Sequence, residues 1–382
     1  MRLGLDASNL RAGGGVTHLT QLLSAAQPEE HGFTRVMVWA GRQTLEQLPA
    51  RAWLEPVHHP MLDAALPARL YWQHVRLSRM AAGSCDLLFV PGGNFCGRFH
   101  PIVTMCRNLL PFEDAERRRF GASRQRVRLE LLLRGQSRTF RDADGVIFLT
   151  EYARASALDK VGRLRGEMAT IPHGVEDRFR IQPRQQKLIT SYSAAHPFRL
   201  LYVSTVDVYK HQWHVAEAVA SLRARFPLTL DLVGSAYPPA LQRLQATMAR
   251  LDPAGAWLRY RESVSYARLH EEYAQADAFV FASSCENLPN ILLEAMAAGL
   301  PIASSERGPM PEVLGDAGLF FDPEDPQEIA TVLESLIRGR DLRTRLADAA
   351  HRRAQDFSWD RCAGETFAFL ARVAQNSERK PK

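Results

Sequence analysis

The chain has 382 residues, which is long enough for two domains with separate cores, and its apolar and charged fractions are those of an ordinary soluble globular protein. Its apolar runs are too short for a transmembrane helix, and the charged first strand does not resemble a secretory signal, so the cytoplasm is the expected location. The net charge of +6 does not choose between nucleic acid, anionic lipid and phosphorylated substrates. The five cysteines have no paired metal-ligand spacing, which argues against structural zinc and for a reducing compartment.

Apolar strands alternate with helical stretches along the whole chain, which is the pattern of doubly wound parallel sheets. The first half carries six predicted strands: Arg2–Asp6, Arg35–Ala40, Asp86–Val90, Ile102–Cys106, Gly145–Leu149 and Met168–Ile171. The second half carries six more: Phe198–Ser204, Leu228–Gly234, Trp257–Tyr260, Ala278–Ala282, Pro301–Ser304 and Gly318–Phe321. The polar segment Asp177–Pro197 is predicted to link domains 1–180 and 195–357.

A glycine-rich loop follows the first strand and precedes a helix predicted to begin near Thr17. Gly13, Gly14 and Gly15 let backbone N–H groups come close to a ligand. The loop is not G-x-G-x-x-G, so a dinucleotide cofactor is not expected. A plain tight turn is the alternative interpretation.

Two polar residues, Arg107 and Asn108, fall at the carboxyl end of the strand that begins at Ile102. In open parallel sheets, functional groups gather at this end of the strands. Asn108 is a candidate to hydrogen-bond a hydroxyl group of a ligand, and Arg107 a candidate to hold a phosphate. The alternative is that both only hold the turn in place.

The segment 116–141 is rich in arginine and carries several leucines. A helix with an arginine face and a leucine stripe is typical of peripheral contact with an anionic membrane. Packing of the leucines on the sheet, with solvated arginines, explains the pattern equally well. Nucleic-acid binding is not expected, because interleaved aromatic residues and a recognisable module are missing.

The second half opens with a strand, a loop that contains Lys210, and a helix from about Gln212, a geometry that suits a phosphate. Lys210 is the best candidate cation to bind such a phosphate. Gly234, at the end of the next strand, allows a nucleotide to approach the backbone closely.

The interpretation of the second half depends most on the stretch from Ser283 to Pro301. A buried strand enters a polar loop with Glu286, and Pro289 then begins a helix that contains Glu294 and ends at Gly299. Glu294 is expected roughly 7 Å inside the helix at about 1.5 Å rise per residue, while Glu286 stays at the mouth. The free N–H groups of the first helical turn lie between them and favour an anion. A nucleoside diphosphate sugar fits, with ribose hydroxyls on Glu294, the diphosphate at the helix end and sugar hydroxyls on Glu286.

The two glutamates eight positions apart, followed by Glu-Ala-Met-Ala-Ala-Gly-Leu-Pro, resemble the retaining GT-B glycosyltransferases of the family-4 type (glycosyl transferases group 1). This resemblance implies two Rossmann-like doubly wound α/β domains facing a central cleft. The first would bind the acceptor and the second the nucleotide sugar, and residues 358–382 would form a helix crossing back to the first domain. No metal or cofactor is expected, since no Asp-x-Asp motif is found in an exposed loop that would serve a diphosphate, and Lys210 with helix ends would replace the cation.

The resemblance also implies the site residues. Family members carry an arginine where this chain has Thr205 and a histidine–aspartate pair where it has Arg107 and Asn108, so Arg107, His211 or helix N–H groups would supply the missing positive charge. The predicted catalytic residues are Glu286, Lys210, Asn108 and Arg107. The predicted donor-binding residues are Gly14, Gly15, Thr205, Lys210, Gly234, Ser263, Glu286, Asn287, Leu288, Pro289, Asn290 and Glu294.

The predicted function is retaining transfer of a sugar, with GDP-mannose as the candidate donor, to a glycan or lipid-linked acceptor in lipopolysaccharide, O-antigen or other surface-polysaccharide synthesis. The enzyme would work in the cytoplasm or at the inner face of its membrane. Two alternatives stay open: a nucleotide-sugar epimerase of the same fold, and a non-catalytic scaffold associated with a membrane.

Overall fold

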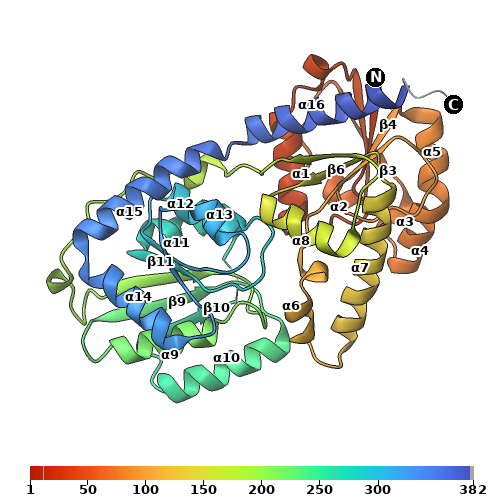
Figure 1. The fold of residues 1–382 in the computed structure, drawn as a ribbon. Coiled ribbons are helices and arrows are strands. Elements are labelled where there is room, and N and C mark those ends of the chain that lie inside the picture. The colour runs from red at the N-terminus through yellow and green to blue at the C-terminus, as the bar shows by residue number, and fades with distance from the viewer. Residues whose placement is uncertain (12, 263, 379–382) are drawn as a thin grey trace. The chain divides into compact units, whose positions relative to one another are not determined.

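The structure, a computed structural model, describes residues 1–11, 13–262 and 264–378, and divides into two compact units (Figure 1). Unit 1 contains residues 1–117, 121–174 and 358 onward, and unit 2 contains residues 118–120 and 175–357. The boundary thus falls between Gly174 and Val175, whereas the sequence placed the end of the first domain at residue 180. The predicted linker 177–197 belongs to unit 2, where Ile181 donates a backbone hydrogen bond to Ala297.

Unit 1 is built on a seven-stranded parallel sheet with the order β3-β2-β1-β4-β5-β6-β7. Its strands are β1 (Arg2–Asp6), β2 (Arg35–Ala40), β3 (Leu54–His58), β4 (Leu87–Val90), β5 (Ile102–Met105), β6 (Gly145–Phe148) and β7 (Glu167–Thr170). Its helices are α1 (Gly14–Ala25), α2 (Arg42–Leu45), α3 (Pro60–Asp63), α4 (Leu66–Tyr71), α5 (Leu77–Ser84), α6 (Asp114–Arg118), α7 (Arg124–Asp142), α8 (Glu151–Val161) and α16 (Trp359–Glu378).

Unit 2 is built on a six-stranded parallel sheet with the order β10-β9-β8-β11-β12-β13. Its strands are β8 (Phe198–Val203), β9 (Leu228–Val233), β10 (Leu258–Arg261), β11 (Ala278–Phe281), β12 (Ile302–Ser305) and β13 (Leu319–Phe321). Its helices are α9 (Gln212–Leu222), α10 (Pro238–Leu251), α11 (Leu269–Gln275), α12 (Asn290–Ala297), α13 (Met310–Leu314), α14 (Pro326–Arg338) and α15 (Arg340–Arg353).

All twelve predicted strands are present, each within one residue of its predicted ends. The strand β3 was not among the predicted strands. It lies at the edge of the first sheet and pairs only with β2 among the described strands. Most of its side chains are exposed and it contains Pro56, which an edge strand tolerates because one side needs no ladder hydrogen bond. An apolar run is therefore not required there, and none marks the strand in the sequence.

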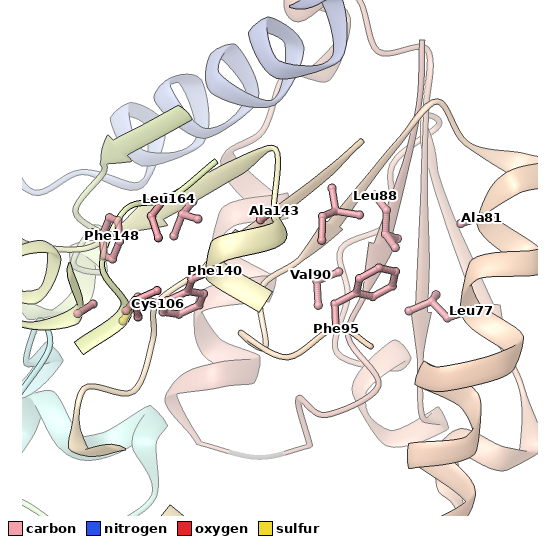
Figure 2. Packing of buried hydrophobic residues seen from close by; sticks show 14 of the residues in the cluster. Leu77, Ala81, Leu88, Val90, Phe95, Cys106, Phe140, Ala143, Phe148 and Leu164 are labelled. Atoms are coloured by element: carbon pink, nitrogen blue, oxygen red, sulfur yellow. The ribbon is translucent and has the colours of Figure 1, made fainter. Parts of the chain in front are cut away.

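Helices cover both faces of the first sheet. Phe369 and Val373 of α16 lie against the backbone of β6, and α16 packs along α1. On the other face, buried residues of α5, α7 and the strands form one hydrophobic cluster. Figure 2 shows Phe95, from the loop after β4, between Phe140 of α7 and Leu77 of α5. These two layers bury the strands on both sides, as a parallel sheet requires.

The strand order reverses direction once in each sheet. In unit 2, the chain moves outward from β8 through β9 to β10, and then returns to the other side of β8 with β11. Right-handed crossovers therefore place α9 and α12 on opposite faces of the sheet. The loops after β8 and β11 diverge from this point, and ligands of open α/β sheets bind in the crevice between two such loops.

Candidate functional site

The two loops that leave the reversal point of the second sheet carry Lys210 and Glu286. Lys210 closes the loop between β8 and α9, and Glu286 lies in the loop between β11 and α12. Their side chains form an ion pair, Lys210 Nζ to Glu286 Oε1, with exposed fractions of only 8% and 15%. The ammonium also lies 5.1 Å from the ring centroid of Tyr209 and 5.5 Å from that of Phe281. The structure thus brings together two residues separated by 76 positions, at the end of the sheet where ligands of open α/β folds bind.

The same two loops are pinned to each other by hydrogen bonds. The backbone N–H of Ser284 donates to the carbonyl of Tyr209 at 2.8 Å, and the Tyr202 hydroxyl donates to the carbonyl of Lys210 at 2.6 Å. His211 Nε2 lies 2.9 Å from Ser284 Oγ. These bonds hold the backbone on both sides of the ion pair, so the positions of Lys210 and Glu286 do not depend on their own contact alone.

His211 is held in an unusual state. It precedes the first turn of α9 with φ 50°, the only positive φ of a non-glycine residue among those the structure describes. Burial, and then the charge of Arg119, lower the pKa of His211 to about 3, so the ring is neutral at neutral pH. Nδ1 is buried and finds no hydrogen-bond partner in the described residues. His211 therefore cannot supply the positive charge that the sequence assigned to it as one option.

Glu294 lies on the second turn of α12, which begins at Asn290 after Pro289, as the sequence predicted. Its side chain is 3% exposed, and both oxygens accept hydrogen bonds from tyrosines: Oε1 from Tyr266 at 3.2 Å and Oε2 from Tyr273 at 2.9 Å. Burial raises the pKa of Glu294 to about 7, against the opposing effect of the two hydroxyls. Tyr266 is partly exposed, and the guanidinium of Arg178 lies 4.3 Å from its ring centroid.

The raised pKa of Glu294 predicts how stability changes with pH. Between about pH 4.5 and pH 7 the folded chain binds more protons than the unfolded chain, so this contribution to stability is complete at low pH and is lost as pH rises through that window. The change amounts to about 3 kcal/mol over the window at about 1.36 kcal/mol per unit. Urea unfolding at a series of pH values should show a flatter profile for Glu294→Gln than for the parent chain. The exposed Glu262→Gln serves as the control, and parallel profiles for all three proteins would contradict the assignment.

The other predicted donor residues of unit 2 surround the same loops. Thr205 Oγ1 lies 3.1 Å from Ser235 Oγ, and the side chain of Gln212 donates to the carbonyl of Thr205 at 3.1 Å. Gly234 has φ 146° and lies against the backbone of Ser204, which links the ends of β8 and β9. Asn287, Leu288, Pro289 and Asn290 lead from the Glu286 loop into α12. Ser263 lies outside the described residues.

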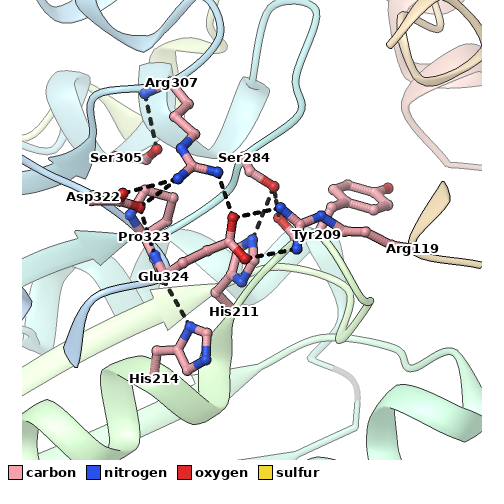
Figure 3. Close-up of polar contacts among 10 residues, drawn as sticks. All are labelled: Arg119, Tyr209, His211, His214, Ser284, Ser305, Arg307, Asp322, Pro323 and Glu324. Atoms are coloured by element: carbon pink, nitrogen blue, oxygen red, sulfur yellow. Dashed lines mark hydrogen bonds and ion pairs between the residues drawn. The ribbon is translucent and has the colours of Figure 1, made fainter. Parts of the chain in front are cut away.

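A second charged cluster, which the sequence did not predict, lies beside His211 (Figure 3). Arg307, from the loop after β12, pairs with Asp322 at 2.8 Å and with Glu324 at 2.5 Å, and Arg119 pairs with Glu324 at 2.6 Å. Arg119, followed by Arg307, lowers the pKa of Glu324 to about 2. Both arginines are therefore engaged by acids in this structure, as Lys210 is by Glu286.

In unit 1, Arg107 and Asn108 have different structural roles. The Arg107 guanidinium donates to the carbonyls of Gly14 at 2.7 Å and Gly15 at 3.2 Å, so it holds the glycine-rich loop. Burial lowers the pKa of Arg107 to about 10, and its Nε is buried with no partner in the described residues. Asn108 is exposed, and its Oδ1 accepts the N–H of Leu110 at 3.2 Å, which holds the turn.

The first helix starts earlier than predicted. α1 begins at Gly14 rather than near Thr17, because Gly13 with φ 65° turns the chain directly into the helix. Gly14 and Gly15 thus form the first helical turn, whose N–H groups have no partner within the helix. No group of three or more histidine, cysteine, aspartate and glutamate residues that could hold a metal occurs among the described residues.

Known proteins share this fold and parts of this sequence. Residues 197–339 match the family model described as "Glycosyl transferases group 1". The structure of sucrose-phosphate synthase from Thermosynechococcus elongatus aligns over 96% of this chain and 97% of its own, with a TM-score of 0.72 and 19% identity. The Anabaena protein HepE in complex with UDP and glucose aligns over 100% of both chains, with a TM-score of 0.69 and 17% identity. The fold is GT-B.

Curated proteins match shorter stretches of the sequence of this GT-B protein. The O-antigen chain mannosyltransferase B of Escherichia coli is 30% identical over 183 residues, which is 47% of each chain. The chain spans about half of the length of the curated relatives it matches, and in some cases less. The matched segment, residues 197–339, contains Lys210, Glu286 and Glu294. It therefore includes both the ion pair and the buried glutamate.

Proposed function

We propose that this GT-B protein is a retaining glycosyltransferase that takes a sugar from a nucleoside diphosphate donor. The observation that carries the proposal is the Lys210–Glu286 pair at the reversal point of the second sheet, inside the segment that matches the glycosyltransferase model. A cation and a carboxylate are the two groups that such a donor needs at its reacting end. The diphosphate leaves with negative charge, and the sugar offers hydroxyl donors.

Lys210 would stabilise the leaving diphosphate, and Glu286 would accept hydrogen bonds from the sugar hydroxyls. In the structure each neutralises the other, which keeps two little-exposed charges paired until a ligand arrives. The N–H groups of the first turn of α12 lie next in the chain after Glu286 and favour an anion. With Thr205 in the place of an arginine, Lys210 carries more of the diphosphate charge than it would in a site with two cations.

Glu294 would bind the ribose hydroxyls of the donor. Tyr266 and Tyr273 now occupy its two oxygens, so a bound ribose must displace one of them. Tyr266 is the better candidate to leave, because its hydrogen bond is the longer one and its side chain is partly exposed, whereas Tyr273 is fully buried. A ribose hydroxyl would then replace the Tyr266 hydroxyl on Oε1.

The donor sugar is proposed to be mannose carried by GDP, used in the synthesis of O-antigen or another surface polysaccharide. The match to an O-antigen chain mannosyltransferase supports this choice. The acceptor, a glycan or a lipid-linked sugar, is assigned to unit 1, where Arg107 holds the glycine-rich loop against β5. This mode of action needs no metal ion.

A thermal-shift screen with GDP-mannose and with UDP-, ADP- and dTDP-sugars tests the donor, because a ligand that binds the folded state raises its melting temperature. We expect the largest shift with GDP-mannose, and loss of that shift in Glu294→Gln. Incubation with the selected donor and an acceptor mixture, followed by NMR of the product, should show an anomeric configuration equal to that of the donor. A shift with UDP-hexoses alone would overturn the choice of GDP-mannose, and an inverted product would overturn the retaining mechanism.

A further inference from the structure

The outward face of α7 combines arginine with exposed aliphatic residues. Val127 and Leu131 are each 61% exposed, one turn apart, whereas Leu129 is buried. The other exposed positions of the helix are five arginines, Arg124, Arg128, Arg134, Arg138 and Arg141, and the terminal Asp142. The buried face of the helix, with Phe140 and Thr139, packs on unit 1. Packing on the sheet therefore does not explain why Val127 and Leu131 are apolar, because their side chains are exposed and do not belong to the core.

The segment that contains α4 and α5 has the same character. Leu66 is 54% exposed, and Leu70 and Tyr71 of α4 are also exposed, together with Arg76 and Arg79 farther along. Five of the large hydrophobic side chains exposed in the described residues thus lie on α4 and α7. Trp72 and Leu77 of the same segment are buried and anchor it to the core.

Both helical segments lie on one face of the first sheet. The loop after β4 joins them: the N–H of Phe95 donates to Thr139 of α7 at 2.9 Å, and the N–H of Arg98 donates to Ser78 of α5 at 3.0 Å. The two segments also share the hydrophobic cluster shown in Figure 2. We name a set of exposed arginine and large apolar residues of α7 and of the segment 66–84 the basic–apolar face; they are Leu66, Leu70, Tyr71, Arg76, Arg79, Arg124, Val127, Arg128, Leu131, Arg134, Arg138 and Arg141.

The charge of these segments is concentrated and almost uncompensated. Residues 124–142 contain six arginines and two acids, Glu130, which pairs with Arg117, and Asp142, which pairs with Arg138, and residues 66–84 contain three arginines and no acid. Together the two segments carry more positive charge than the +6 of the whole chain. The rest of the protein therefore carries slightly more negative than positive charge.

We propose that the basic–apolar face binds the surface of a membrane that contains anionic phospholipid. Arginines among exposed leucine, valine and tyrosine side chains match an interface where phosphates lie beside acyl chains. A nucleic acid would use the arginines but not the aliphatic side chains, and Tyr71 is the only aromatic residue of the face, too few for stacking on bases. No helix in the part of the chain that the structure describes has the length and apolar character needed to cross a bilayer.

Co-sedimentation with vesicles tests the proposal without any sugar substrate. The full chain should bind vesicles of equal parts phosphatidylcholine and phosphatidylglycerol, and should not bind vesicles of phosphatidylcholine alone. The triple variant Arg124→Gln, Arg128→Gln, Arg134→Gln should bind the anionic vesicles at least about tenfold more weakly, since each arginine near the surface contributes on the order of 1 kcal/mol. The matched control removes three exposed arginines of unit 2, Arg259→Gln, Arg345→Gln and Arg352→Gln, and should bind as the parent does.

The double variant Val127→Ser, Leu131→Ser separates insertion from charge attraction. It should bind several-fold more weakly, and its remaining binding should disappear in high salt, where the parent keeps part of its affinity. Melting temperatures near that of the parent exclude unfolding as the cause, as expected for substitutions at exposed positions. Equal loss in the unit 2 control would overturn the proposal. So would tighter binding to a DNA duplex than to anionic vesicles at the same salt, without an effect of the double variant.

Discussion

Replacing Lys210 with methionine is expected to lower the turnover number of sugar transfer by about 10²–10³-fold, the usual effect of removing one group that stabilises charge in a transition state. Thr205 cannot contribute a positive charge, and His211 is neutral. Lys210 therefore faces the leaving diphosphate without a second cation from these loops. Initial rates with the donor selected by the thermal-shift screen measure the effect.

Lys210→Met also leaves the Glu286 carboxylate without its ion-pair partner. Removing one partner of a buried ion pair lowers the free energy of unfolding by about 3–5 kcal/mol. Urea unfolding must therefore accompany the kinetics. The double variant Lys210→Met, Glu286→Gln removes both charges and should recover most of the stability, yet stay inactive. Lys187→Met, at an exposed lysine of the same unit, should keep the parent rate. A stable double variant with near-parent activity would show that the pair is structural only.

Replacing Gly234 with alanine is expected to destabilise the fold by about 2 kcal/mol or more and to weaken nucleotide binding. The residue has φ 146°, a conformation that L residues rarely adopt, and backbone strain of this kind costs on the order of 1–3 kcal/mol. A Cβ there would lie 2.2 Å from the carbonyl oxygen of Ser204, a backbone atom that cannot rotate away. The ends of β8 and β9 would have to separate, which would shift the loop that positions Lys210.

Gly255 provides a matched control for the strain alone. It also has a positive φ, 62°, but a Cβ there meets no atom within 4 Å. Gly255→Ala should therefore cost only about 1 kcal/mol and leave nucleotide affinity unchanged. Free energies of unfolding and nucleotide titrations of the two variants measure the difference. Equal costs in both variants would mean that the contact with Ser204 adds nothing to the conformational strain.

The strands could be predicted because burial on both faces of a parallel sheet forces apolar runs such as Ala278–Phe281. The exception, β3, lies at an edge, where partial exposure and Pro56 remove that signal. The start of α1 was placed late, since three glycines suggest a loop, and only the backbone shows that two of them enter the helix. Local residue preferences thus predict elements better than their ends.

At the site, too, some features can be predicted from the sequence and others cannot. Lys210 and Glu286 were proposed from residue type and position relative to strand ends, and the structure places them in one ion pair. The tyrosines on Glu294 could not be assigned, because a tyrosine far along the chain gives no sign of its partner until the fold is known. Asp322 and Glu324, which engage Arg307, were missed for the same reason. Arg107 was considered as a phosphate ligand, whereas its hydrogen bonds go to glycine carbonyls of its own unit.

A crystal structure of the chain with the nucleoside diphosphate sugar selected by the screen tests the central claim most directly. The account predicts that the diphosphate lies within hydrogen-bond distance of Lys210 Nζ, that the ribose replaces Tyr266 on Glu294, and that Glu286 turns from Lys210 to the sugar. A nucleotide bound instead in the groove of about 650 Å³ lined by residues of α9, α10 and α14, with the Lys210–Glu286 pair intact, would contradict it.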